Sequence, residues 1–271
     1  MPERILTPSQ NALLGIAAGS IEVCCQQPML YLKNASQQGL PMTLDPRILY
    51  RGLFASVANM GILTGIQFPL TGLVSQAFTG GVDRRLSSRE MVASGFCGGL
   101  ISGLVCGPME LIMIQQQRFG TSIMSTPGRV MAQGGGGGAL LRGVTTACGR
   151  EGLFTAGYLG LAPALSRQLV DDGVLGEGAA DVAGAIGAGV VAATLSHPVD
   201  TIKTCMQGDI AGTKFGTVRA TASVLMQEAG FKSFFRGWTW RTGRMIGATF
   251  IIGKCKKIIG PIMFPSAQDD L

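Results

Sequence analysis

The sequence predicts an all-α membrane protein of three tandem helix pairs, and three observations lead to this fold class. Only 14% of the 271 residues are charged and 46% are hydrophobic, whereas soluble domains carry roughly 25% charged residues. The mean hydropathy is +0.35, and the 41 glycines suit helices that pack closely in lipid. One type of apolar segment also recurs three times, each copy centred on a Pro. Disorder, collagen and coiled coil are excluded by this composition.

Several function classes are disfavoured by charge and cysteine usage. The net charge of +6 is scattered between apolar blocks, so we expect no nucleic-acid partner. The seven Cys form no CxxC pair and there is one His, so we expect no metal site and interpret the Cys as small buried apolar residues. The first residues show neither a signal peptide nor a cleaved transit peptide.

The Pro-centred segments are the predicted first helices of the three pairs. Nine positions before each Pro stands a Gly, and nine positions after each stands a Gln. The prolines are Pro28, Pro108 and Pro198, the glycines Gly19, Gly99 and Gly189, and the glutamines Gln37, Gln117 and Gln207. A small residue four positions before each Gly completes a small-xxx-small pattern that lets helices approach closely. A Pro inside such a helix should kink it.

The second helix of each pair is predicted to open at an aromatic, one residue and a Gly. The three copies are Tyr50 to Gly52, Tyr158 to Gly160 and Phe235 to Gly237. Six apolar segments therefore alternate in three repeats, 1–87, 88–178 and 179–271, and each segment has the roughly 20 residues needed to cross a bilayer. From the opening Gly to the next Pro, the first repeat spans 108 − 52 = 56 residues and the second 198 − 160 = 38. This difference predicts a shortened fourth helix.

After each Pro comes a charged motif, and on this motif the chain resembles the mitochondrial carrier family. The family pattern P-x-[D/E]-x-x-[K/R] is complete from Pro198 through Asp200 to Lys203, while Leu30 replaces the first acid and Met113 the second base. The resemblance implies a six-helix bundle with pseudo-threefold symmetry around one central cavity, which opens alternately to either side of the inner mitochondrial membrane. It implies no cofactor, and membrane lipid such as cardiolipin as a partner.

The resemblance also implies a gate on the matrix side, in which each motif acid pairs with the motif base of the next repeat. Glu110 would then pair with Lys203, and Asp200 with Lys33. The third pair would join Leu30 to Met113, and because both are apolar the two departures cancel; removing one charge alone would strand a buried ion. Gln37, Gln117 and Gln207 match the family's glutamine braces across these pairs. The alternative is that the glutamines face solvent at a helix end.

The predicted solute site is a stripe on the second helices of the pairs. Counted from each opening Gly, positions on one helical face carry Asn59 and Gln67, then Arg167, Gln168 and Asp171, then Arg241 and Arg244. An ionisable group at this depth in a membrane indicates function, and the planar fork of Arg suits carboxylates. The alternative for Arg241 and Arg244 is a structural ion pair, or side chains that reach to the membrane surface.

The residues of this stripe resemble those at the same positions in particular carriers. Arg167 followed by Gln168 is similar to the Arg-plus-amide contact of keto-acid and di- or tricarboxylate carriers. Amino-acid carriers tend to show an Arg with an acid there, and adenine-nucleotide carriers a Gly with an aliphatic residue. The spacing of Arg241 and Arg244 resembles the sixth helix of citrate carriers, although Leu63 and Gln67 replace their positive residues on the second helix. A dicarboxylate or keto acid is therefore easier to accommodate than a trianion.

Two further features need an interpretation. Glu22, six residues before Pro28, either carries a proton across with an anion or pairs with an arginine of the cavity, and we favour the pairing. The run from Gly134 to Gly138 is interpreted as a flexible linker, since no Lys or Ser/Thr follows in P-loop order.

The predicted function is a monomeric inner-membrane carrier that exchanges small carboxylates such as citrate or 2-oxoglutarate. The alternative is a carrier-fold protein that serves as a structural subunit of a larger membrane assembly. The shortened fourth helix motivates this alternative, together with the family's cytoplasmic motif, which is unrecognisable after Phe68 and Val174. An enzyme is the weakest interpretation, because no nucleophile–base pair, metal set or dinucleotide fingerprint is present.

Overall fold

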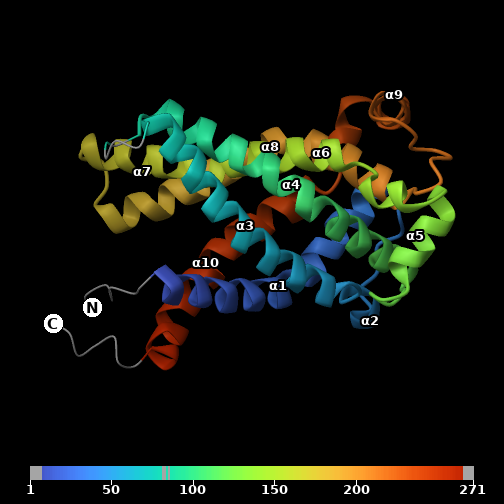
Figure 1. The fold of residues 1–271 in the computed structure, drawn as a ribbon, viewed down its shortest axis with the longest axis horizontal. Helices are drawn as coiled ribbons and strands as arrows, with labels where there is room; N and C mark the ends of the chain where they lie inside the picture. Colours follow the sequence, from blue (N-terminus) through green and yellow to red (C-terminus); the bar gives the residue numbers. More distant parts are fainter. Residues whose placement is uncertain (1–7, 81–83, 85, 265–271) are drawn as a thin grey trace.

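A computed structural model describes residues 8–80, 84 and 86–264, and every regular element in these ranges is a helix (Figure 1). The long helices are α1 (Pro8–Gln38), α3 (Leu53–Thr79), α4 (Ser88–Phe119), α8 (Glu177–Gly208) and α10 (Trp238–Met263). A sixth long segment runs without a break through α6 (Val144–Thr155), the π-helical turn η2 (Ala156–Leu161) and α7 (Ala162–Asp171). The short elements are α2 (Pro46–Leu49), α5 (Thr126–Gly134), η1 (Gly137–Leu141), α9 (Val218–Ala229) and η3 (Gly230–Phe235). The predicted all-α fold is confirmed.

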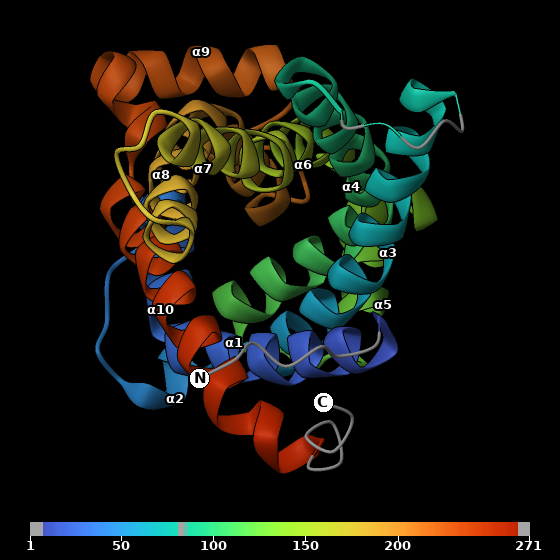
Figure 2. The ribbon, with the colours of Figure 1, turned by 90° about the vertical axis from the view of Figure 1, so that its left-hand side faces the viewer.

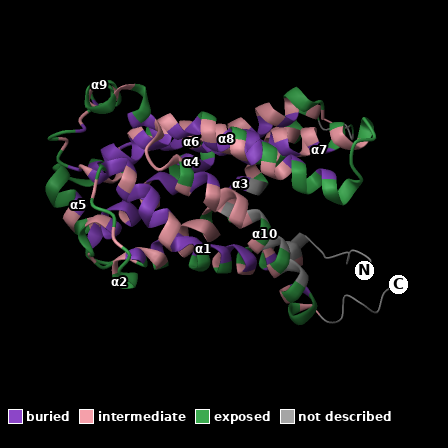
Figure 3. Ribbon diagram, turned by 180° about the vertical axis from the view of Figure 1, so that it is seen from behind, coloured by how far each residue is buried: buried purple, intermediate pink, exposed green. Residues whose placement is uncertain are grey.

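The six long segments form a closed ring. Seen along the ring axis, they follow one another in the order α1, α3, α4, α6–α7, α8 and α10 (Figure 2). Each segment contacts both of its neighbours, and α10 closes the ring against α1. Figure 3 shows the buried residues along the middle of α4, α6 and α8, with exposed residues on α5, α9 and the end of α7. The first and last long helices, α1 and α10, are therefore neighbours in the ring.

The two ends of the ring differ. The short helices α2, α5 and α9 lie at one end (Figure 1), where α1, α4 and α8 also finish. We call this the gate end. At the other end, called the terminal end, α1 begins and α10 finishes. The first short helix, α2, has only four residues, because 14 residues separate Gln37 from Gly52.

Three helical stretches among the described residues have both the length and the hydropathy needed to cross a membrane. They are Pro46–Thr79, Ser88–Phe119 and Glu177–Gly208, with mean hydropathies of 1.4, 1.7 and 1.5. Large apolar side chains such as Leu104 and Leu195 are more than half exposed on α4 and α8, as expected for a lipid-facing surface. The full set of six spans remains a prediction, as do the repeat boundaries.

The three glycines in register make the same contact in each repeat. Gly19 faces Met60 on α3, Gly99 faces the Glu151 carbonyl and Thr155 on α6, and Gly189 faces Met245 on α10. Each glycine therefore packs its helix against the second helix of its own pair, which supports the threefold repetition. Pro28, Pro108 and Pro198 lie inside α1, α4 and α8 as predicted. Whether each of them kinks its helix remains a prediction.

The fourth helix opens at Gly143, so the prediction that it opens at Gly160 is wrong. Gly52, Gly143 and Gly237 share a left-handed conformation with φ of 77°, 73° and 79°, and each directly precedes a long helix. From Gly143 to Pro198 there are 198 − 143 = 55 residues, close to the 56 of the first repeat. The fourth helix is therefore not shortened. Gly160 instead packs against α4, where an added Cβ would lie 2.6 Å from the Val92 Cα.

Candidate functional site

Two buried ion pairs join the long helices near the gate end, and both are the pairs implied by the motif. The Lys33 Nζ lies 2.8 Å from the Asp200 Oδ2, which joins α1 to α8. The Lys203 Nζ lies 3.0 Å from the Glu110 Oε2, which joins α8 to α4. All four residues are buried. Pro108 and Pro198 lie two residues before the acids, inside α4 and α8.

The third junction, between α1 and α4, is apolar. Leu30 and Met113 belong to one buried cluster with Ala55 and Ile114. One turn nearer the gate end, the Asn34 amide donates a hydrogen bond to the Gln117 side-chain oxygen at 2.6 Å. The two departures from the motif therefore meet each other, and no charge is stranded at either position.

The three glutamines are buried, so the alternative that they face solvent is wrong. Gln37, Gln117 and Gln207 are 0%, 3% and 0% exposed. Gln37 donates to the Asp200 carboxylate at 2.8 Å, and it therefore braces the Lys33–Asp200 pair as predicted. Gln117 instead accepts from Asn34, and Gln207 donates to the carbonyl oxygen of Gly107 at 3.2 Å. The prediction that each glutamine braces an ion pair is therefore confirmed for Gln37 and wrong for Gln117 and Gln207.

Arg150 and Glu151 on α6 extend the two ion pairs into one cluster, and the sequence analysis missed both. The Arg150 Nη2 lies 2.6 Å from the Glu110 Oε1, and its Nε lies 3.6 Å from the Asp200 Oδ1. Arg150 also forms an ion pair with Glu151. Arg241 on α10 approaches Asp200 at 3.3 Å. The central ion cluster is therefore Lys33, Glu110, Arg150, Glu151, Asp200, Lys203 and Arg241.

The signal for Arg150 and Glu151 was present in the sequence. Leu141-Arg142-Gly143 matches Tyr50-Arg51-Gly52 and Phe235-Arg236-Gly237 in its Arg-Gly step. Counted from Gly143, the stripe positions that hold Asn59 and Arg244 on the other helices fall on Arg150. The requirement for an aromatic residue at the first position led to Gly160 instead.

Arg167, Gln168 and Asp171 do not lie at the centre of the ring, so their prediction as a mid-membrane site is wrong. The predicted opening Gly160 lies 160 − 143 = 17 residues after the observed opening Gly143. The predicted stripe therefore lies on α7, nearer to the terminal end. There Arg167, Gln168 and Asp171 are all exposed. They line a surface pocket of about 510 Å³ together with Ser87 and Ser88 at the start of α4.

Glu22 pairs with an arginine, which confirms the favoured interpretation of this residue. The Arg244 Nη2 lies 3.3 Å from the Glu22 Oε1. Gln26 donates to the same oxygen at 2.8 Å. This pair joins α1 to α10, and the Glu22 residue is 2% exposed. A carboxylate on a neighbouring helix thus neutralises Arg244, as Glu110 and Asp200 do for Arg150.

On the second helix of the first pair, Gln67 and Asn59 behave differently. Gln67 is buried and donates a hydrogen bond to the Thr155 hydroxyl, so it ties α3 to α6. The Asn59 Oδ1 is buried without a hydrogen-bond partner in the described chain, as are the Glu151 Oε2 and the Arg244 Nε. Because buried polar atoms are nearly always hydrogen-bonded, these atoms have capacity for a polar solute or water.

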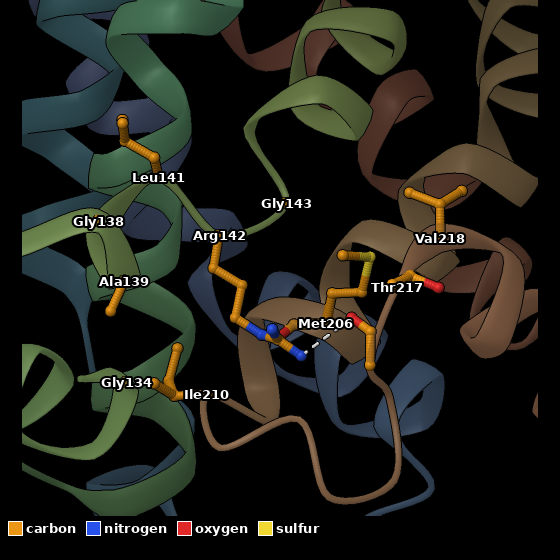
Figure 4. Close-up of a pocket in the computed structure, with 11 residues that line it drawn as sticks. Gly134, Gly138, Ala139, Leu141, Arg142, Gly143, Met206, Ile210, Thr217 and Val218 are labelled. Atoms are coloured by element: carbon orange, nitrogen blue, oxygen red, sulfur yellow. Dashed lines mark hydrogen bonds between the residues drawn. The ribbon is translucent and has the colours of Figure 1, made fainter. Parts of the chain in front are cut away.

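A second pocket, of about 460 Å³, lies at the gate end around Arg142 (Figure 4). The Arg142 Nε donates to the carbonyl oxygen of Met206 at 2.8 Å, and Gly134 and Gly138 line the same pocket. Gly134 ends α5 and Gly138 lies within η1. The Gly run is therefore partly helical, and its interpretation as a flexible linker is wrong for these positions. Lipid binding remains a prediction.

The remaining sequence predictions concern the burial of the cysteines and the expected lack of a metal site. Cys106, Cys148 and Cys205 are buried as predicted, whereas Cys24 and Cys25 are exposed on α1, so the prediction is wrong for these two. Among the residues that the structure describes, no group of three or more His, Cys, Asp and Glu is placed to hold a metal ion.

Comparison with known proteins points to the same family as the charged motif. A family model described as mitochondrial carrier protein matches residues 177–259, the part that contains the complete motif. The tricarboxylate transport protein of Saccharomyces cerevisiae is 24% identical over 88% of this chain and 90% of its own length. These matches support the resemblance of the chain to the mitochondrial carrier family. Mitochondrial uncoupling protein 5 of Arabidopsis thaliana is 22% identical over 76% of this chain and 70% of its own length.

The family that the chain resembles indicates its location and its general role. Mitochondrial carriers are proteins of the inner mitochondrial membrane, and they are transporters rather than enzymes. The resemblance also predicts an orientation in which the gate end faces the matrix side and the terminal end the opposite side, and this orientation remains a prediction.

Proposed function

We propose that this carrier moves a small carboxylate of about one net negative charge across the membrane by alternating access. The observation that supports this is the charge balance of the side chains around the ring axis, which are buried except for the partly buried Arg150 and Arg244. The cations are Lys33, Arg150, Lys203, Arg241 and Arg244, and the carboxylates are Glu22, Glu110, Glu151 and Asp200. The balance is 5 − 4 = +1, which a monoanionic solute neutralises.

Among small carboxylates, an acidic amino acid fits this charge pattern best. Each Arg near the axis already contacts an acid, so a solute carboxylate that binds Arg150 displaces Glu151. An ammonium group on the solute then supplies the cation that Glu151 loses, whereas a keto acid or citrate leaves that carboxylate buried and unpaired. In the family resemblance, Arg150 followed by Glu151 also matches the Arg-plus-acid contact of amino-acid carriers rather than the Arg-plus-amide contact expected from Arg167 and Gln168.

Exchange in proteoliposomes tests this proposal. Purified protein is reconstituted with internal substrate, and uptake of labelled aspartate, glutamate, malate, 2-oxoglutarate and citrate is measured. We expect aspartate or glutamate to exchange at least about tenfold faster than citrate, since one unpaired buried charge costs more than about 1.4 kcal/mol. Folded protein that exchanges none of the five, or citrate fastest, contradicts the proposal.

The matched variants are Arg150→Gln and Arg167→Gln, two arginines on the same continuous helical segment. Arg150 lies in the central ion cluster, whereas Arg167 is exposed near the terminal end. We expect exchange to be lost in the first variant and to stay near the wild-type rate in the second. Equal rates in both variants contradict a role for the cluster.

The role of a structural subunit in a larger membrane assembly now rests on the missing cytoplasmic motif alone, because the fourth helix has its full length. Co-migration with a larger complex on native gels, combined with no exchange of any tested solute, would favour this role over transport.

A further inference from the structure

The residue directly before each motif Pro faces the opening of the second helix of its own pair. These residues are Gln27, Gly107 and His197. The side-chain amide of Gln27 on α1 donates to the carbonyl oxygen of Arg51 at 3.0 Å. The Nε2 of His197 on α8 lies 3.0 Å from the carbonyl oxygen of Arg236. The first and third repeats therefore make the same hydrogen bond at the same position.

The carbonyl group that accepts this bond belongs to the Arg of the Arg-Gly step, just outside the helix that follows. The first helical bond of α10 runs from the Arg241 amide to the Gly237 carbonyl oxygen at 3.1 Å, so the Arg236 carbonyl lies one residue outside the helix. An acceptor in that place needs a donor from another element. The side chain before the motif Pro supplies this donor.

Both donors are fully buried, and each uses one of its two polar atoms. Gln27 and His197 are 0% exposed. Because a carbonyl oxygen can only accept, the Nε2 of His197 carries a proton. The His197 Nδ1 and the Gln27 Oε1 are buried without a hydrogen-bond partner in the part of the chain that the structure describes. The N–H at the ε position is therefore the group that both side chains contribute.

The middle repeat lacks this donor. Gly107 has no side chain, and a Cβ added to it would lie 3.3 Å from the Cγ2 of Val144 at the start of α6. The Arg142 carbonyl oxygen is approached instead by the Gln207 amide of the next repeat, at 3.5 Å. A side-chain bond within one helix pair is thus a feature of the first and third repeats.

The third repeat differs from the first in the residue that this bond places. Four positions after the opening Gly stand Ser56 on α3 and Arg241 on α10. The Arg241 Nη1 lies 3.3 Å from the Asp200 Oδ2, and its Nη2 donates to the Ser196 Oγ at 2.6 Å. Ser196 and His197 are adjacent on α8. Helix α8 therefore holds both the backbone before α10 and the guanidinium group one turn into it.

We propose that His197 is a positioning residue for Arg241: its Nε2–H fixes the opening of α10 against α8, so that the guanidinium meets Asp200 in the central ion cluster. The property that this role requires is an N–H at the ε position of the side chain. Glutamine has the same group, and Gln27 uses it for the same bond in the first repeat. A glutamine at position 197 should therefore replace the histidine, whereas an apolar side chain should not.

Tryptophan fluorescence reports how the opening of α10 lies on α8. Trp238 and Trp240 are the two tryptophans of the chain, and both lie in the first turn of α10. The Trp238 Nε1 donates to the Thr194 Oγ1 on α8 at 3.0 Å. The emission maximum and the quenching by acrylamide are measured on the full-length protein in detergent, and a melting curve shows that each variant is folded.

Four variants separate the N–H group from the volume of the side chain. His197→Gln should keep the wild-type emission and quenching. His197→Leu has a similar size but no donor, so its emission should shift to longer wavelength and its quenching should rise. His197→Asn places its nitrogen at the δ position, where the His197 Nδ1 has no partner, and should behave as His197→Leu. Gln27→Leu removes the matching bond from the first repeat and should leave the emission unchanged.

Exchange of labelled aspartate extends the test to transport, and this one measurement rests on the proposed function. His197→Leu should raise the half-saturating aspartate concentration severalfold, while His197→Gln should leave it at the wild-type value. A shifted emission with an unchanged half-saturating concentration would overturn the role of His197 for Arg241. If the wild type exchanges no solute, the proposed function is contradicted, and the emission of the variants still decides on His197.

Wild-type emission in folded His197→Leu would overturn the proposal, and so would equal shifts in His197→Leu and His197→Gln. An equal shift in Gln27→Leu would also overturn it, because the effect would then not be specific to α10. If His197→Leu does not fold, His197→Asn takes its place, and wild-type emission in that variant would overturn the proposal in the same way.

Discussion

Removing either partner of the Lys33–Asp200 pair should have very different effects, because Asp200 has several cations and Lys33 has one carboxylate. Asp200 lies 2.8 Å from Lys33, 3.3 Å from Arg241, 3.4 Å from Lys203 and 3.6 Å from Arg150. In Lys33→Met the other three cations still neutralise Asp200. In Asp200→Asn, Lys33 and Arg241 both lose the carboxylate that they contact.

The magnitudes follow from the cost of an unpaired buried charge. Stranding a buried ion costs about 3–5 kcal/mol, and 1 kcal/mol lowers the Tm of a domain of roughly this size by about 2–4 °C. We therefore expect Asp200→Asn to lower the Tm by about 10 °C and Lys33→Met to change it by about 3 °C or less. The double variant should be more stable than Asp200→Asn alone, because it no longer contains the stranded ammonium group.

The assay is thermal unfolding of the detergent-purified protein, followed by the fluorescence of Trp238 and Trp240 at one fixed scan rate. Glu90→Gln serves as a surface control, since its Arg84 partner is 43% exposed and such pairs contribute little. A Tm loss in Lys33→Met as large as that in Asp200→Asn would refute the reasoning. A double variant less stable than Asp200→Asn would refute it as well.

Two further predictions concern helix packing and pH. Gly103→Ala should lower the Tm by several degrees, because the new Cβ would lie 2.6 Å from the Cys148 Cα. Gly187 on α8 has open space around it, so Gly187→Ala should leave the Tm equal or slightly higher. Equal losses of Tm in both variants would contradict the packing argument. At the gate end, a hydrogen bond from Lys214, 2.6 Å away, holds the pKa of Glu228 below its usual range. A lowered folded pKa gives stability above the unfolded value of about 4.3 that is lost as pH falls further. The Tm difference between wild type and Glu228→Gln should thus be constant from about pH 8 to 5 and shrink below about 4, and a difference that shrinks already between about pH 8 and 5 would contradict this.

The sequence predicted the first helix of each pair well because each pattern there corresponds to a contact. Gly19, Gly99 and Gly189 each face the second helix of their own pair, and the motif charges of α8 meet those of α1 and α4. The equal spacing of the glutamines from each Pro predicted that they lie at one height, but it did not predict their hydrogen-bond partners. Gln117 bonds to Asn34 because the facing helix offers an amide there, a detail that no spacing encodes.

The fourth helix was mispredicted because an aromatic residue was used to find its start. The physical requirement at that point is a residue that tolerates a positive φ before a helix, and Gly143 meets it without an aromatic. Tyr158 happens to stand two residues before Gly160 and imitated the pattern. The same error counted the stripe position to Arg167 instead of Arg150, whereas Arg241 and Arg244 lie near the ring axis as expected, because Gly237 does open α10.

The α1–α4 junction differs from the other two in what its opening would expose. Separating an ion pair returns two charges to water, so much of the lost attraction is recovered as hydration. Separating Leu30 from Met113 exposes apolar side chains, at about 1.5–3 kcal/mol for each one fully exposed. A solute carboxylate can compete with Asp200 and Glu110 for their cations, but it has no group that replaces an apolar contact. The gate should therefore open at the two charged sides of α8 while α1 and α4 stay together. Added salt should then speed maleimide labelling of the buried Cys205 thiol, whose Sγ donates to the carbonyl oxygen of Gln37 across the α1–α8 junction; labelling that is independent of salt would argue against this asymmetry.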